Sequence, residues 1–124
     1  MVPVTDLHVV LASASPRRRD LLDLIGIRHT VSPADVDESL RLGELPEAYV
    51  ERLAREKAET LAATNAGSLI IGADTTVVVD DIVLAKPEDT GDAERMLGML
   101  SGRSHTVLTA VAVNYQGKTV SAVE

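Results

Sequence analysis

The sequence predicts an α/β fold in which a mixed, twisted sheet is flanked by helices. Short apolar segments typical of strands alternate with longer segments whose apolar residues recur at helical spacing. The longest apolar segment, residues 68–79, is rich in β-branched residues and is typical of a central strand buried on both faces. At 124 residues the chain is long enough for a core of its own, so residues 1–124 are expected to form one domain.

The first third of the chain predicts a strand, a helix and a second strand. Residues 7–12 form a short apolar segment that leads through the loop 13–15 into a helix. That helix is expected to begin at Pro16 and to end near Ile25, because Gly26 follows. The next strand covers residues 28–32 and stops at a proline.

A long helix is expected from Pro46 to about Ala66. Its buried stripe consists of Val50, Leu53, Ala54, Ala58, Leu61 and Ala62. Lys57 falls on the same stripe, so its side chain either reaches solvent at the edge of the stripe or points its ammonium group into an occupied site. Arg52 and Glu56 are four residues apart and predict an ordinary ion pair on the surface.

The central apolar segment contains two unusual residues. Gly72 indicates a bulge or a close approach of another backbone. Asp74 is an isolated carboxylate, which is unfavourable in a buried strand unless it is paired, binds a metal or faces a polar cleft. The competing interpretation is that Asp74 only accepts hydrogen bonds from nearby backbone groups.

The last third predicts a hairpin, a helix and two strands. Asp80-Asp81 is a turn signal before the strand at 82–84. Thr90 is the expected N-cap of a helix that ends at Ser101-Gly102, and strands follow at 105–115 and 118–123.

The composition limits the classes of function. The net charge of −7 argues against non-specific binding to nucleic acid or to an anionic membrane, and the two aromatic residues argue against a platform for base stacking. Cysteine is absent, which excludes disulfides, thiol nucleophiles and thiolate metal sites. No signal peptide and no apolar segment of about 18 residues is present, so a cytoplasmic location is expected.

The junction between the first strand and the first helix favours an anion. Ser15 is a natural N-cap, and the helix start presents free backbone N–H groups and the positive end of the dipole. Arg17 and Arg18 add positive charge in the first turn, where cations are normally unfavourable, and an arginine fork matches phosphate oxygens. A solvated basic cluster on a surface helix is the competing interpretation.

The unusual polar residues together suit binding and hydrolysis of a polyphosphate. They are Ser13, Arg17, Arg18, Glu38, Lys57, Asp74 and Lys86. Cationic side chains neutralise phosphate oxygens and a leaving group, while carboxylates hold a divalent cation or activate water. A Walker-type loop is absent, and the three histidines are dispersed along the sequence.

Several segments resemble the Maf family of nucleoside triphosphate pyrophosphatases, the septum formation proteins. They are residues 13–22, 49–58, 71–75, 84–89 and 96–107. The resemblance implies a fold similar to the inosine triphosphate pyrophosphatases, with the nucleotide in a cleft between two lobes. It also implies hydrolysis of a nucleoside triphosphate to the monophosphate and pyrophosphate with Mg²⁺ or Mn²⁺. The pattern is more similar to the branch that acts on dTTP and UTP than to the branch that acts on 7-methyl-GTP.

The resemblance also implies roles for individual residues. Asp74 matches the proton acceptor, and Lys57 and Lys86 match catalytic positions. Ser13, Arg17, Arg18 and Thr75 match positions that bind the substrate, with Arg17 and Thr75 contributing to specificity. Glu38 and Asp74 would hold the metal. A homodimer is an assembly that the resemblance allows.

Family members continue well beyond the position that matches residue 124, so the second lobe is expected to be largely missing. The cleft would then be more open and wetter. Three functions stay open on this basis. The first is an active nucleoside triphosphate pyrophosphatase, and the second is a catalytically impaired remnant that binds nucleotide. The third is a structural fragment whose uncovered sheet edge drives dimerisation.

Overall fold

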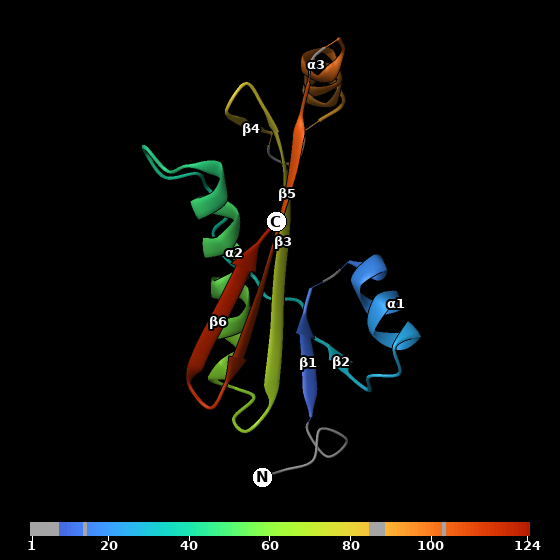
Figure 1. Ribbon diagram of the computed structural model, residues 1–124, viewed down its shortest axis with the longest axis vertical. Coiled ribbons are helices and arrows are strands. Elements are labelled where there is room, and N and C mark those ends of the chain that lie inside the picture. The colour runs from blue at the N-terminus through green and yellow to red at the C-terminus, as the bar shows by residue number, and fades with distance from the viewer. Residues whose placement is uncertain (1–7, 14, 85–88, 103) are drawn as a thin grey trace.

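The computed structural model describes residues 8–13, 15–84, 89–102 and 104–124. Within these residues, six strands form one sheet, two of the three helices lie on either side of it, and the third lies at one end of the strands (Figure 1). The strands are β1 (Val9–Ala12), β2 (Thr30–Val31), β3 (Leu69–Val79), β4 (Ile82–Leu84), β5 (Thr106–Tyr115) and β6 (Lys118–Val123). The helices are α1 (Pro16–Leu24), α2 (Pro46–Ala62) and α3 (Thr90–Leu100).

The sheet is mixed, which confirms the predicted fold class. Its order is β2-β1-β3-β5-β6, with β4 also paired to β3. Strands β1, β2 and β3 run parallel to one another. Strands β4 and β5 run antiparallel to β3, and β6 runs antiparallel to β5.

One edge of β3 is left open between two neighbouring strands. Strand β5 occupies the other edge from Ile70 to Val78, so β1 and β4 must share this one. The pairing with β1 ends at Gly72, and the pairing with β4 begins at Val77. We call the intervening residues 73–76 the β3 window. It lies just past the carboxyl end of β1, the edge at which open α/β sheets bind ligands.

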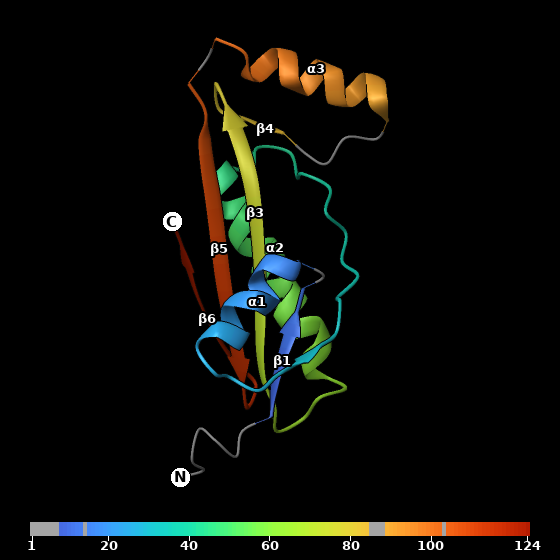
Figure 2. The ribbon, with the colours of Figure 1, turned by 90° about the vertical axis from the view of Figure 1, so that its right-hand side faces the viewer.

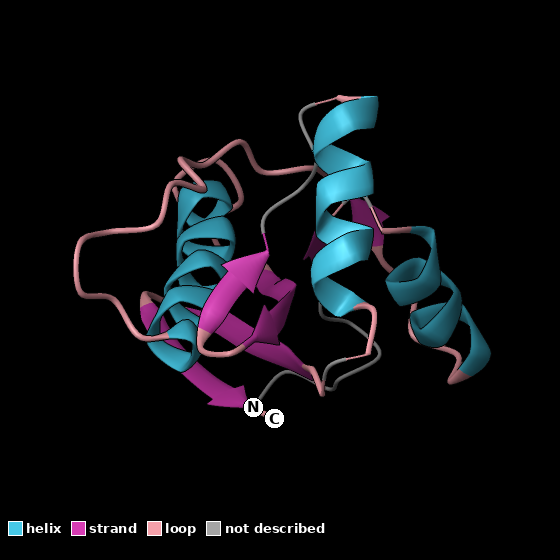
Figure 3. Ribbon diagram, turned by 90° about the horizontal axis from the view of Figure 1, so that it is seen from above, coloured by secondary structure: helices cyan, strands magenta, loops and turns pink. Residues whose placement is uncertain are grey.

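Helix α2 covers one face of the sheet and forms the core with it. Figures 1 and 3 show α2 and α1 on opposite sides of the strands. The core cluster joins α2 to β1, β3 and β5 and consists of Val10, Ala12, Val50, Ala54, Ala58, Ile70, Ala110 and Ala112. At Gly72 the backbones of helix and strand touch, because an added Cβ would lie 2.8 Å from the Ala58 nitrogen and still closer to the Ala54 carbonyl. This confirms the close backbone approach that the glycine indicated.

The opposite face of the sheet is covered only in part. Helix α1 lies on this face (Figure 2), yet none of its nine residues is buried, and Leu24 is 81% exposed. Along β3, Ile70 on the α2 side is fully buried, whereas Thr75 on the α1 side is exposed. The prediction of a strand buried on both faces therefore holds only in part on the α1 side, because a pocket lined by Ile71 and Thr75 lies between the strand and the helix.

Most element boundaries follow the sequence, and the differences have local causes. Helix α2 ends before the predicted Ala66, where the Asn65 side chain donates to the Leu61 carbonyl at 2.9 Å. The N-cap of α3 is Asp89 rather than Thr90, because the Asp89 carboxylate accepts a hydrogen bond from the Asp92 backbone at 2.7 Å. Ser15 occupies the N-cap position of α1, but its side chain makes no capping hydrogen bond.

The turn between β3 and β4 and the lengths of the helices are the remaining features of the fold. Asp80 and Asp81 both have positive φ angles, 51° and 64°, and form the predicted turn between β3 and β4. None of the helices in the described part of the chain is both long and apolar enough to cross a membrane.

Candidate functional site

The β3 window brings together side chains from both faces of the sheet. Because β1 stops at Ala12 while β3 continues, groups that follow β1 or extend from the helices reach residues 73–76. Asp74 and Thr75 are adjacent in the strand, so their side chains point to opposite faces. Asp74 is approached from α2, and Thr75 is approached from α1.

On the α2 side, one ammonium group lies between two carboxylates. Lys57 Nζ is 3.0 Å from Asp74 Oδ1 and 3.2 Å from Glu38 Oε1. The side chains of Lys57 and Asp74 are each only 14% exposed, and Glu38 is 41% exposed at the rim. The Lys57 ammonium group therefore points toward the two carboxylates and does not extend into solvent at the edge of the helix stripe. Asp74 is paired with the Lys57 side chain, so the interpretation that Asp74 only accepts hydrogen bonds from nearby backbone groups is wrong.

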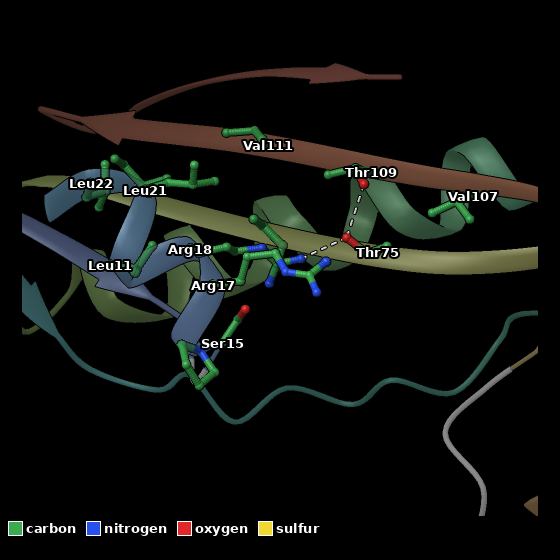
Figure 4. A pocket seen from close by; sticks show the side chains of 13 residues that line it. Leu11, Ser15, Arg17, Arg18, Leu21, Leu22, Thr75, Val107, Thr109 and Val111 are labelled. Carbon is green, nitrogen blue, oxygen red and sulfur yellow. Dashed lines mark hydrogen bonds between the residues drawn. The ribbon is translucent and has the colours of Figure 1, made fainter. Parts of the chain in front are cut away.

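On the α1 side, Arg18 spans the window. Its Nη1 atom donates to Ser13 Oγ at 3.0 Å and to the Ala73 carbonyl at 3.4 Å. Its Nη2 atom donates to Thr75 Oγ1 at 2.8 Å, and Thr75 Oγ1 lies 3.1 Å from Thr109 Oγ1 on β5 (Figure 4). One guanidinium thus fixes the loop after β1, the backbone of β3 and a hydroxyl pair.

Two adjoining pockets open on these groups. The larger, about 860 Å³, lies between α1 and the sheet and is mainly apolar, with Leu11, Ile71 and Val111 among its lining residues. This volume is within the range of small-molecule sites. Figure 4 shows Arg17 and Arg18 between the leucines of α1 and Thr75. The smaller, about 450 Å³, is more polar and is lined by Ser13, Asp35, Glu38 and Lys57, among others. Ser15 lines both, so the pockets meet at the start of α1.

The chemistry of the donor groups fits a hard divalent cation. Glu38 and Asp74 each place one carboxylate oxygen against the Lys57 ammonium group, so the two carboxylates lie close together and a divalent cation would bind beside that ammonium. No group of three or more His, Cys, Asp or Glu side chains that could hold a metal occurs among the described residues. A cation held by Glu38 and Asp74 would therefore complete its shell with water and phosphate oxygens, which is the usual pattern for Mg²⁺.

The other predicted residues are distributed as follows. Arg17 lines the larger pocket beside Arg18. Lys86 lies outside the residues that the structure describes. The histidines lie at three separate strands, with His8 before β1, His29 before β2 and His105 before β5.

Sequence reasoning missed Thr109 and misjudged Arg52. Thr109 is an unremarkable strand residue, and only the pairing of Thr75 with Thr109 in the β3–β5 register brings it to the pocket. Arg52 does contact Glu56 at 3.4 Å, but its side chain is only 13% exposed and its nearest partner is Glu44 at 2.7 Å. The prediction of an ordinary surface pair is therefore wrong for Arg52.

The chain is similar to proteins of known family. The dTTP/UTP pyrophosphatase of Myxococcus xanthus is 54% identical over 105 residues, which is 85% of this chain and 54% of the relative. The protein of the same name from Anaeromyxobacter sp. (strain Fw109-5) is 53% identical over 94% of this chain and 55% of its own length. The chain thus spans about half the length of these curated relatives.

Solved structures share the fold at low sequence identity. The nucleoside-triphosphatase (dITP/XTP pyrophosphatase) of Mycobacterium abscessus matches with a TM-score of 0.61 and 15% identity, over 95% of this chain and 71% of that one. The Ham1 protein of Staphylococcus aureus matches with a TM-score of 0.57 and 16% identity, over 94% and 69% of the two chains. The family described as Maf-like protein matches residues 8–124, nearly the whole sequence. The chain belongs to the Maf-like protein family.

Proposed function

We propose that this chain carries the site of a nucleoside triphosphate pyrophosphatase that acts on dTTP and UTP. The observation that carries the proposal is the convergence of Lys57 and Arg18, from two different helices, on the adjacent residues Asp74 and Thr75. A proton acceptor on the strand then lies next to phosphate-binding cations that two helices supply. The names of relatives about half identical to this chain support the choice of substrate.

The two pockets suggest how a nucleotide would lie. The apolar wall of the larger pocket, with Leu11, Ile71 and Val111, suits the base and sugar. The start of α1, with Arg17 and Arg18, suits the triphosphate, because arginine forks bind phosphate oxygens in pairs and the helix start favours negative charge. The triphosphate would then run from the larger pocket towards the smaller one.

The reaction needs a base next to the phosphate chain. Asp74 accepts a proton from a water molecule, whose oxygen attacks the α-phosphorus. The bond from the α-phosphorus to the bridging oxygen breaks, and pyrophosphate leaves with the electron pair. Lys57 orients the Asp74 carboxylate, and Arg18 binds the developing charge on the phosphate oxygens. A Mg²⁺ or Mn²⁺ ion held by Glu38 and Asp74 would neutralise further phosphate charge.

Pyrophosphate release tests the proposal. We expect the purified protein to release pyrophosphate from dTTP and UTP in the presence of Mg²⁺ and more slowly from 7-methyl-GTP. Asp74→Asn should lower the rate by about 10²–10⁴-fold, as expected for loss of a general base, with triphosphate binding largely kept. Asp81→Asn is the matched control, because Asn tolerates the positive φ of that turn.

Two results would overturn the proposal. The first is a folded wild-type protein with no metal-dependent release of pyrophosphate from any of the three nucleotides. The second is an Asp74→Asn variant that turns over as fast as Asp81→Asn, which would exclude Asp74 as the base.

A further inference from the structure

The loop that carries Glu38 has no regular secondary structure to hold it. Residues 32–45 between β2 and α2 form neither helix nor strand. Glu38 nevertheless sits 3.2 Å from Lys57, at the polar pocket proposed to bind the cation. Something outside the loop's own backbone must therefore fix the position of Glu38.

Tyr49 fixes the backbone of Glu38 directly. The phenol of Tyr49, one turn into α2, donates to the Glu38 carbonyl at 2.6 Å. The tyrosine is 5% exposed, so its phenol is largely shielded from water and its hydrogen bond to the Glu38 carbonyl meets little competition. The hydrogen bond places the loop against the helix at the residue that carries the carboxylate.

Arg52 fixes the next residue and the far end of the same loop. Its Nη2 atom donates to the Ser39 carbonyl at 2.9 Å, and its Nε and Nη2 atoms bind the two oxygens of Glu44 at 2.7 and 2.9 Å. Such a two-point arginine–carboxylate contact fixes orientation as well as distance. The Arg52 guanidinium also lies 5.6 Å from the centre of the Tyr49 ring, so the two residues act on the loop as one unit.

The loop therefore docks on α2 at three residues. Tyr49 and Arg52, three residues apart, hold its backbone, and Lys57, five residues beyond Arg52, meets the Glu38 carboxylate. We propose that Tyr49 and Arg52 are positioning residues that place the Glu38 carboxylate for binding the divalent cation. This inference rests on the proposed function, in which Glu38 and Asp74 hold that cation.

The same helix offers a matched control. Arg55 also ties α2 to a neighbouring segment, with Nη1 donating to Ser121 Oγ at 2.7 Å and Nη2 to the Thr119 carbonyl at 3.5 Å. These partners lie on β6, on the far side of β5 from the β3 window. Loss of Arg55 should therefore weaken packing without moving Glu38.

The experiment measures Mn²⁺ binding to the nucleotide-free protein, together with hydrogen exchange of the amides at 38–44. We expect Tyr49→Phe and Arg52→Met each to weaken Mn²⁺ binding by about 10-fold or more, in line with the usual effect of removing a partner of a metal ligand. Glu38→Gln, which removes the proposed ligand itself, should weaken binding at least as much. Tyr49→Phe and Arg52→Met should also speed exchange in the loop. Arg52→Lys should recover only part of the affinity, because an ammonium group lacks the fork. Arg55→Met should leave Mn²⁺ affinity unchanged.

Several outcomes would overturn the inference. One is equal Mn²⁺ affinity in Arg52→Met and wild type, and another is an equal loss in Arg52→Met and Arg55→Met, which would indicate a stability effect alone. A Glu38→Gln variant with wild-type affinity, or a wild type that binds no Mn²⁺, would have the same consequence. If Mn²⁺ binding follows the expected pattern but no nucleotide is hydrolysed, the proposed function fails and the positioning role stands.

Discussion

The ammonium group of Lys57 lies 3.0 Å from the Oδ1 atom of Asp74, and the contact joins helix α2 to the β3 window. The same Nζ atom lies 3.2 Å from Glu38, so one positive charge separates two negative ones. In a site where Lys57 and Asp74 are each 14% exposed, solvent screens these charges only in part. The lysine is therefore the shared partner of the two carboxylates and offsets the repulsion between them.

The first prediction follows from removing that charge. Lys57→Met should lower the free energy of unfolding by roughly 1–3 kcal/mol, less than for a fully buried pair, because Glu38 and Asp74 are left to repel each other. Mg²⁺ should raise the melting temperature of this variant more than that of wild type, since the cation replaces the ammonium between the carboxylates. Thermal unfolding with and without Mg²⁺ measures both effects.

Lys118→Met is the control for this measurement, because Lys118 is exposed at the start of β6. It should change neither stability nor the response to Mg²⁺ appreciably. A Mg²⁺-induced shift in Lys57→Met no larger than that in Lys118→Met would contradict the expectation.

The second prediction concerns the two side-chain hydrogen bonds that the Arg18 guanidinium makes at once. Its guanidinium bonds Ser13 and Thr75 at once, and a lysine cannot make both contacts from one nitrogen in the same geometry. Arg18→Lys should raise the KM for dTTP by about 10- to 100-fold, the effect of losing one or two charged hydrogen bonds. Arg19→Lys, at a position 53% exposed on the same helix, should leave KM near the wild-type value. Equal KM values for the two variants would remove Arg18 from the binding site.

Much of the fold could be predicted because its signals are local. The apolar segment that became β3 and the two aspartates at 80–81 each indicated one structure, and Gly72 indicated either a bulge or the close backbone approach that the structure shows. The coverage of the sheet could not be predicted in this way. How closely α1 packs on the sheet depends on the relative position of elements that are far apart in the sequence, and Leu24 of this helix is 81% exposed.

Some residues of the candidate site also have a local signal in the sequence, and others do not. Asp74 and Lys57 were identifiable because a charge in an apolar pattern needs a partner, and here each is the partner of the other. Thr109 and Arg52 sit in patterns that ordinary strand and helix residues also show. Their roles come from strand register and from the path of a loop without secondary structure, neither of which leaves a periodic signal.

The third prediction tests the contact between α2 and β3. Gly72→Ala should lower the free energy of unfolding by roughly 1–3 kcal/mol, because the new methyl group would press into the hydrogen-bonded turn between Ala54 and Ala58. Gly98→Ala, in α3 with no atom near the added Cβ, should instead raise it by about 0.5–1 kcal/mol through better helix propensity. Urea unfolding measures both, and equal effects of the two substitutions would argue against the close approach at Gly72.

The fourth prediction is a pH dependence that arises from Glu44. Hydrogen bonds from Arg52 lower the pKa of Glu44 in the folded protein from its usual 4.5 to about 2. Between these values the unfolded chain binds a proton at Glu44 and the folded protein does not. The stabilisation is therefore complete above pH 4.5 and is lost as the pH falls towards 2, with a slope of at most about 1.4 kcal/mol per pH unit.

Glu44→Gln isolates this contribution, because glutamine keeps an acceptor for Arg52 but has no proton to gain in this range. At neutral pH the variant should be less stable than wild type, and the difference should shrink steadily between pH 4.5 and 2. Glu47→Gln, at the first turn of the same helix, provides the comparison for a carboxylate without the arginine fork. Urea unfolding across this pH range decides the matter. The free energies of unfolding of wild type and Glu44→Gln could instead differ by the same amount at every pH. That result would mean that the Arg52 contact does not shift the pKa of Glu44, because stability depends on pH in this range only where the fold favours the charged carboxylate.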